Sequence, residues 1–168
     1  LAKPHVCFER FPARAPLPAG HRFPMDKYDL IPAQLKYEGT ITDSNLFEPT
    51  AANEASILLT HTAEYWDQLK NQTLSPKEIR KMGFPLSPEL VHREHVINRG
   101  TEMAAHYALQ YGVGMNVSGG THHAFTDHGE GFCLLNDIAM AANCLLRDKL
   151  AKQILVVDLD VHQGNGTA

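Results

Sequence analysis

The apolar run at residues 154–157 ends in three polar residues at alternate positions, Asp158, Asp160 and His162. Consecutive branched apolar residues are typical of a strand that is buried on both faces. Because strand geometry sends alternate side chains to the same side, the three polar groups are expected to share one face where the strand ends. Gly164 then predicts a turn. The pattern therefore predicts a buried strand over 154–158 that delivers two carboxylates and an imidazole to one edge.

Two helical patterns precede this strand. Residues 87–89 (Ser-Pro-Glu) combine a capping serine, a proline in the first turn and an acid near the positive helix end. They predict a helix to about Gln110. A second apolar stripe predicts a helix over about 137–150, and residues 113–117 form a short apolar strand pattern between the two. Helix, strand, helix, strand is the order of an α/β fold with a mainly parallel sheet, in which the 113–117 and 154–158 strands lie close together.

The first part of the chain carries weaker patterns. Repeated prolines in residues 1–24 predict an extended segment that lies over a surface. Residues 26–37 favour a short helix, and residues 39–53 are rich in turn formers. Residues 55–59 favour a strand, and residues 62–70 favour a helix with a threonine cap.

Length and composition fit one globular domain. The chain has 168 residues, of which 43% are hydrophobic and 20% charged, and its net charge of −4 gives no basic nucleic-acid footprint. Three widely spaced cysteines favour a reducing compartment, cytoplasmic or nuclear, over a disulfide scaffold. No apolar run approaches the ~20 residues of a membrane span. The chain opens on Leu1, so an organelle-targeting peptide is not excluded.

A second group of polar residues follows the 113–117 strand. Two glycines at 119 and 120 predict a tight turn that delivers the adjacent His122 and His123 to the same sheet edge as Asp160 and His162. Neighbouring histidines suit a metal pair, a proton-transfer pair or plain loop residues. By contrast, the pair His92 and His95 has helical spacing and no nearby carboxylate, which predicts a solvated helix face.

The carboxylates beside His162 favour a metal site over an ordinary polar loop. A carboxylate and an imidazole two residues apart can hold one metal ion, and a second carboxylate can orient a neighbouring group. Buried acids are costly unless they are paired or bind a metal. At residues 131–133, glycine before Phe132 suits a wall along which a narrow substrate chain slides, although a core role for Phe132 fits as well. Cys133 has no visible activating partner and is expected to pack.

Taken together, these motifs resemble the zinc-dependent histone deacetylase family. The matching segments are GGTHHA at 119–124, GFCLLND at 131–137 and DLDVHQGNGT at 158–167. HRFPMDKY at 21–28 and GFPLSPELV at 83–91 extend the match over nearly the whole chain. The HQGNG variant is most similar to the class IV deacetylases and their bacterial and plant relatives. The resemblance implies the arginase/deacetylase fold, a parallel sheet flanked by helices with zinc at its carboxyl edge.

The resemblance also assigns roles residue by residue. It implies that Asp160 and His162 are two zinc ligands, that His122 is the general base, and that His123 is its partner. Asp158 matches the acid that bonds the first histidine. Gly131 and Phe132 match the wall of the acyl-lysine channel, and the backbone around Asp158, Asp160 and His162 matches a structural potassium site.

The chain departs from the family pattern at two points. Asn165 stands where many members have an aspartate facing the second histidine, which replaces a charged partner of His123 with a neutral one. The family's third zinc ligand and its transition-state tyrosine lie beyond the last matching motif. Residues 1–168 are therefore expected to be the N-terminal part of a single deacetylase domain, inactive without the missing C-terminal segment.

The implied reaction is zinc-dependent hydrolysis of an acyl-lysine amide in a histone or another protein. Three alternatives remain open. An acylpolyamine or another small acylated amine would be a different substrate for the same chemistry. A binuclear manganese ureohydrolase shares the fold but needs more carboxylates. A non-catalytic acyl-lysine reader or scaffold fits Asn165. No nucleic-acid or membrane partner is expected.

Overall fold

A computed structural model describes residues 5–7 and 17–168, so most of the predicted extended segment at 1–24 lies outside the described residues. The sheet has three parallel strands in the order β2-β1-β3. They are β1 (His5–Cys7), β2 (Leu46–Phe47) and β3 (Gly114–Asn116). In register, Val6 pairs with both Leu46 and Met115. The predicted α/β class with a parallel sheet and flanking helices is confirmed.

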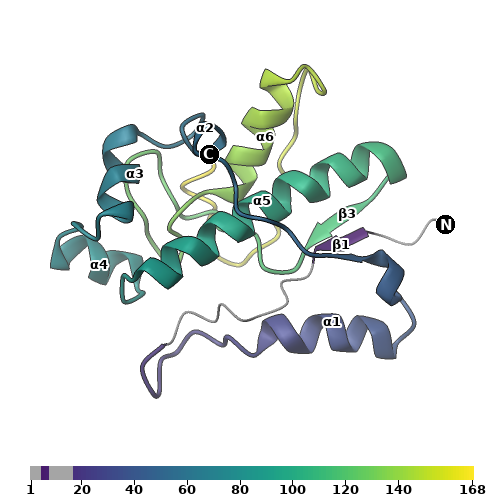
Figure 1. The fold of residues 1–168 in the computed structure, drawn as a ribbon, viewed down its shortest axis with the longest axis horizontal. Coiled ribbons are helices and arrows are strands. Elements are labelled where there is room, and N and C mark those ends of the chain that lie inside the picture. Colours follow the sequence, from purple (N-terminus) through teal and green to yellow (C-terminus); the bar gives the residue numbers. More distant parts are fainter. Residues whose placement is uncertain (1–4, 8–16) are drawn as a thin grey trace.

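Helix α5 (Pro88–Tyr111) is the longest element and crosses the middle of the molecule (Figure 1). It begins as predicted, because the Ser87 hydroxyl accepts a hydrogen bond from the Leu90 N–H at 3.2 Å. It ends at Gly112, whose φ of 92° is readily adopted only without a side chain. The helix packs against β1, β3 and α6 (Asp137–Arg147), and so it joins the sheet to the segment that leads to the C-terminus.

The remaining helices are α1 (Lys27–Tyr37), α2 (Glu54–Ile57), α3 (Ala63–Lys70) and α4 (Pro76–Met82), with a 3₁₀ turn at Asp43–Asn45. The strand predicted at 55–59 is wrong. Asn53 instead caps a single helical turn there by accepting a hydrogen bond from the Ser56 N–H at 2.8 Å. A local cap therefore prevails over the β propensity of a short apolar run.

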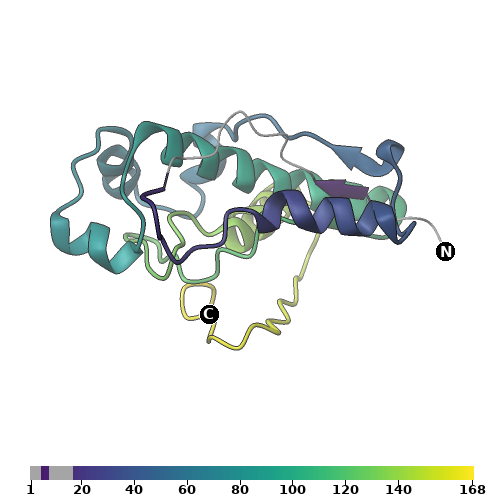
Figure 2. The ribbon, with the colours of Figure 1, turned by 90° about the horizontal axis from the view of Figure 1, so that it is seen from below.

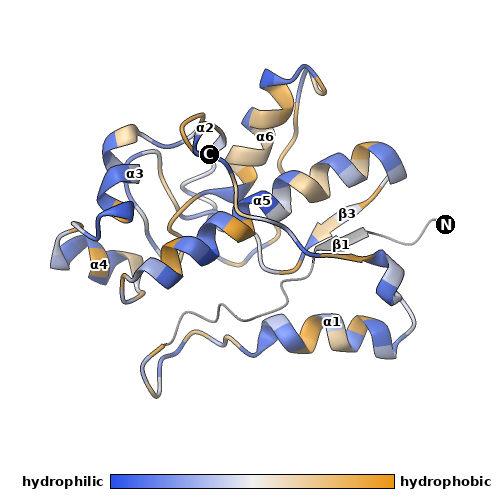
Figure 3. Cartoon of the chain, viewed as in Figure 1, coloured by the Kyte–Doolittle hydropathy of each residue, from blue (hydrophilic) through white to orange (hydrophobic). Residues whose placement is uncertain are grey.

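The main core lies where α3, α4 and the first half of α5 meet the loop at 132–135. Figure 3 shows that α6, which closes this region, is largely apolar. Trp66 packs against His95 with tilted rings whose centroids are 4.5 Å apart. His95 is therefore half-buried and the solvated face predicted for it is wrong, whereas His92 is exposed. The buried members of this cluster include Ile57, Tyr65, Trp66, Leu69, Met82, Phe84, Leu90, Leu134, Leu135 and Met140.

The buried strand predicted at 154–158 is also wrong. After α6 the chain forms an extended arm, residues 152–163, that leaves the body and returns only near the C-terminus (Figure 2). Leu155 is 85% exposed and Val157 67% exposed, and no strand among the described residues pairs with the arm. An apolar run becomes a buried strand only when a neighbouring strand and a covering layer meet it. In the described residues, none of the helices is long and apolar enough to cross a membrane.

His61 supplies a prediction for stability. It is 3% exposed, its Nε2 accepts a hydrogen bond from the Asn136 N–H at 3.0 Å, and burial lowers its pKa to about 4. The neutral ring therefore stabilises the fold fully above pH 6.5, and this contribution is lost as the pH falls towards 4, because the unfolded chain binds the proton first. Between about pH 7.5 and about pH 5, His61 should lower the free energy of unfolding by about 2 kcal/mol.

Urea unfolding of the chain at the two pH values measures this change. The variant His61→Gln keeps a hydrogen-bond acceptor without a proton to gain, so its loss of stability over the same interval should be smaller by that amount. The variant His92→Gln, on an exposed position of α5, should behave as the wild type does. An equal pH dependence in His61→Gln and wild type would contradict the prediction.

Candidate active site

The two adjacent histidines lie on the loop that follows β3. The Asn116 side chain accepts a hydrogen bond from the Ser118 N–H at 3.0 Å, which turns the chain at the strand end. Gly120 has a φ of 90°, and the tight turn it forms brings the next residues back over the sheet edge. His122 is buried at 7% exposure and His123 is half-buried, with their ring centroids 4.2 Å apart.

His122 pairs with Asp158, as predicted. The distance from His122 Nδ1 to Asp158 Oδ2 is 2.6 Å. The hydrogen bond with His122 lowers the pKa of the Asp158 carboxyl below its usual range, and the Asp160 N–H, 3.0 Å from Oδ1, adds to this effect. The ionised carboxylate fixes the proton of His122 on Nδ1, which leaves Nε2 as the basic nitrogen.

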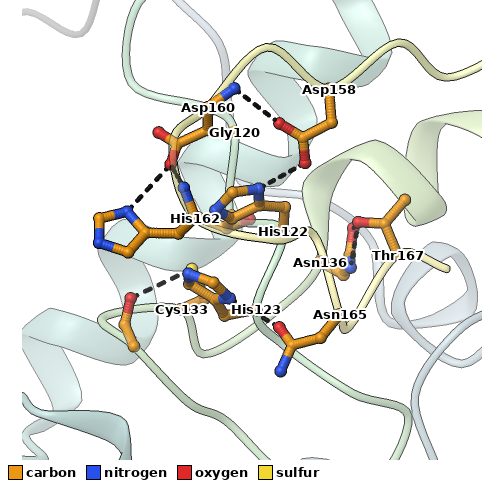
Figure 4. A network of polar contacts seen from close by, with 12 residues as sticks. Gly120, His122, His123, Cys133, Asn136, Asp158, Asp160, His162, Asn165 and Thr167 are labelled. Carbon is orange, nitrogen blue, oxygen red and sulfur yellow. Dashed lines mark hydrogen bonds and ion pairs between the residues drawn. The ribbon is translucent and has the colours of Figure 1, made fainter.

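Asp160 and His162 lie side by side on the returning arm (Figure 4). Asp160 Oδ1 accepts a hydrogen bond from the His162 N–H at 2.7 Å and faces His162 Nδ1 at 3.0 Å. The His162 N–H is the larger cause, and the His162 ring the second, of the lowered pKa of the Asp160 carboxyl. Asp160 Oδ1 and His162 Nδ1 thus lie next to each other.

His123 contacts the last loop of the chain. Its Nδ1 lies 2.7 Å from Asn165 Oδ1, so the neutral amide predicted to face His123 does so (Figure 4). The Gly166 N–H donates to the His122 carbonyl at 2.9 Å, which fastens this loop to the histidine loop. The rings of His123 and His162 lie 6.0 Å apart. His122 and His123 therefore both contact residues of the C-terminal segment.

These groups open into one cavity of about 530 Å³. Among the predicted residues, the cavity is lined by His122, His123, Gly131, Phe132, Asp160 and His162, whereas Asp158 and Asn165 stand behind it. Phe132 adopts a φ of 67° and contacts the rings of Phe23 and Phe84, so it is both a cavity wall and part of an aromatic cluster. Burial raises the pKa of the Cys133 thiol to about 12, as expected for a packed residue.

The donor set fits part of a zinc site. Carboxylate oxygen and imidazole nitrogen are both zinc ligands, and catalytic zinc sites normally have three protein ligands. Within the described part of the chain, no group of three or more His, Cys, Asp or Glu side chains is placed to hold a metal ion. Asp160 and His162 could therefore supply two of the three ligands that such a site needs.

Sequence reasoning missed several residues at this site, and four of them bear on its charge and geometry. Arg22 and Lys27 line the cavity, and burial, with Arg93 second, lowers the pKa of the Lys27 ammonium. Asn136 and Asp137 are buried behind the histidine loop and bond to it. The Asn-Asp pair before an apolar stripe indicates a helix cap, and nothing local shows that the same side chains contact another loop.

Comparisons with known proteins agree on one family. The family model of the histone deacetylase domain matches residues 21–168. An uncharacterized protein of Picosynechococcus sp. is 42% identical over 153 residues, which are 91% of this chain and 51% of that protein. Histone deacetylase 2 of Arabidopsis thaliana is 26% identical over 152 residues, which are 87% of this chain and 39% of that protein.

A solved structure gives the same result. The crystal structure of an HDAC homolog complexed with SAHA has a TM-score of 0.81 and 25% identity, and the match covers 98% of this chain and 46% of that one. The chain thus spans about half or less of the length of these relatives. Because the family model matches most of its length and the solved structure shares its fold, the chain belongs to the histone deacetylase domain family.

Proposed function

We propose that this chain carries part of the active site of a zinc-dependent deacetylase that hydrolyses the amide bond of an acylated lysine. The carrying observation is that His122, held by Asp158, faces the same cavity as the pair Asp160 and His162. Membership of the family supports this activity. So does the related HDAC homolog, which is complexed with SAHA.

In this proposal, Asp160 and His162 hold zinc, which when bound polarises an amide carbonyl and makes a water molecule more acidic. His122 accepts the proton of the attacking water at Nε2, since Nδ1 is engaged by Asp158. Asp158 keeps the ring in this tautomer and stabilises the charge that it gains. The third zinc ligand and the transition-state tyrosine are expected outside the described donor set.

His123 takes part in proton transfer, and the cavity wall orients the substrate. Because the Asn165 oxygen accepts from His123 Nδ1, the Nε2 of His123 is left facing the cavity beside His122. The departing lysine amine takes a proton from this histidine pair, and the proton that His122 removed from the attacking water restores it. Phe132 and Gly131 form the side on which an aliphatic lysine chain would lie. The proposal also includes a structural potassium site formed by the backbone around Asp158, Asp160 and His162. It further takes residues 1–168 as the N-terminal part of a single deacetylase domain.

The charges of the cavity favour acyl-lysine over acylpolyamines. Arg22 and Lys27 line it, and no carboxylate of the described residues forms an ion pair with either. The two carboxylates that line the same cavity are engaged, Glu94 with Arg93 at 2.8 Å and Asp160 with His162. An acylated polyamine retains a second ammonium group that would meet these cations.

This charge distribution gives a substrate prediction. In the full-length protein, kcat/KM should be at least about tenfold higher for an acetyl-lysine peptide than for an acetylated diamine. The variant Arg22→Glu should narrow the ratio, whereas Arg80→Glu, an exposed change outside the cavity, should leave it unchanged. A higher kcat/KM for the acetylated diamine would favour the amine hydrolase, and peptide binding without any turnover would favour a reader.

A further inference from the structure

We propose that Asn136 and Asp137, at the start of α6, are positioning residues that hold the His122–His123 dipeptide from both sides. Asp137 binds the residues before the dipeptide, and Asn136 binds the residue after it. Their effect on catalysis rests on the proposed function, but their effect on the histidines can be measured without it.

Asp137 fixes the approach to His122. Its carboxylate is buried at 1% exposure and accepts hydrogen bonds from the Gly120 N–H at 3.1 Å and the Thr121 N–H at 2.7 Å. The Thr121 hydroxyl donates to it at 2.6 Å and accepts from the Asp137 N–H at 3.0 Å. The Thr101 hydroxyl donates to the second oxygen. The residue directly before His122 is thus fastened through both its main chain and its side chain.

The loop closes tightly around this carboxylate. A Cβ atom at Gly119 would lie 2.4 Å from Asp137 Oδ2, so only glycine permits the approach. A buried carboxylate is costly unless donors surround it. Here successive backbone N–H groups, two hydroxyls and the positive end of α6 all stabilise the charge. Asparagine in place of Asp137 would keep the shape of the side chain, but it would turn an NH₂ group towards other hydrogen-bond donors.

Asn136 fixes the exit from His123. Its Nδ2 donates to the Ala124 carbonyl at 3.0 Å and to the Thr167 hydroxyl at 3.0 Å. Its Oδ1 accepts from the Ala139 N–H at 2.9 Å, which caps α6. Thr167 is two residues beyond Asn165, the partner of His123. One helix end therefore joins the histidine loop to the loop that carries this partner.

The two functions of Asn136 can be separated by substitution. Asn136→Asp retains the oxygen that caps α6, because aspartate caps as well as asparagine, but it loses the amide donor to Ala124 and Thr167. Thr121→Val removes the hydroxyl that bonds to Asp137 with little change of shape, and Thr121→Ser restores it. Asp137→Asn tests the carboxylate directly. Asp127→Asn is the matched control, because its exposed carboxylate contacts only His128 among the histidines.

The experiment is nitrogen NMR of the imidazole rings, with amide hydrogen exchange, in the whole chain without metal. In wild type, His122 and His123 should each show one tautomer with the proton on Nδ1. Asn136→Asp should give mixed tautomers at His123, and Thr121→Val and Asp137→Asn should do so at His122. Amide exchange at Gly120 and Thr121 should accelerate at least about tenfold in the latter two variants. Thr121→Ser should restore the wild-type signals.

Folded Asn136→Asp and Thr121→Val variants with unchanged imidazole signals would overturn the proposal and leave a purely structural role for α6. If Asp137→Asn does not fold, the Thr121 pair still decides the question, because it removes one hydroxyl only. In an active full-length protein, the same variants should lower kcat with little change in KM. If that protein hydrolyses nothing, the proposed function fails while the NMR result stands on its own.

Discussion

Replacing Asp160 or His162 with alanine is expected to abolish zinc binding and amide hydrolysis together in the full-length protein. Each variant removes one of the two proposed zinc ligands that line the cavity, and catalytic zinc sites normally have only three protein ligands. The affinity for zinc should fall by more than about 100-fold, because losing even a residue that only hydrogen-bonds to a zinc ligand lowers the affinity by up to about that factor. Calorimetric titration with zinc and an acetyl-lysine peptide assay measure the two quantities.

The matched controls are Asp67→Ala and His92→Ala, because both residues are exposed on helices and do not line the cavity. Both should bind zinc as the wild type does. If Asp160→Ala or His162→Ala retained one tightly bound zinc ion, the ligand assignment would be wrong. A wild-type stoichiometry of two metal ions would instead favour the binuclear alternative.

The second large effect is expected at His122. His122→Ala should lower kcat by about 10²-fold or more while zinc remains bound, because a positioned general base contributes on that scale. Asp158→Asn keeps the shape of the pair but no longer carries the charge that stabilises a protonated ring, so its kcat should also fall. Turnover and zinc content measured on the same samples separate catalysis from metal binding.

His128→Ala is the control for this series, since His128 lies on the neighbouring loop and does not line the cavity. Its kcat should stay close to that of the wild type. Loss of zinc in His122→Ala would make His122 a ligand and contradict its assignment as a base. A kcat unchanged in His122→Ala would transfer the role to His123.

Local signals made much of the fold predictable. The cap at Ser87 and the glycine at 112 fix both ends of α5, because caps depend on neighbours within one helical turn. The predicted contact between His122 and Asp158 is present, whereas of the three alternating residues only Asp160 and His162 line the cavity. This contact forms although the strand expected to deliver Asp158 is absent, because residues 164–168 fasten the returning chain to the histidine loop.

The wrong strand at 55–59 reflects a local cap by Asn53, whereas the other errors and omissions depend on contacts that are distant in sequence. Residues 154–158 carry a strand pattern, but pairing requires a neighbour that the pattern cannot supply. Asn136 and Asp137 have the sequence of an ordinary helix start, yet their side chains bond to Ala124 and Thr121 in another loop. Arg22 lines the cavity only because its segment folds back over Phe132, where its guanidinium lies 4.9 Å from the ring centroid.

The exposure of the arm affects how much of the time the proposed site is assembled. Asp158, Asp160 and His162 all belong to a segment with little apolar burial, whereas His122 is buried against the body. Segments of this kind open locally far more often than cores unfold. Each opening would exchange the carboxylate partner of His122 for solvent and separate the donor pair from the base. In residues 1–168, we therefore expect the proposed site to be assembled only while the arm is closed, and any contact that covers the arm should increase the fraction of time for which it is closed.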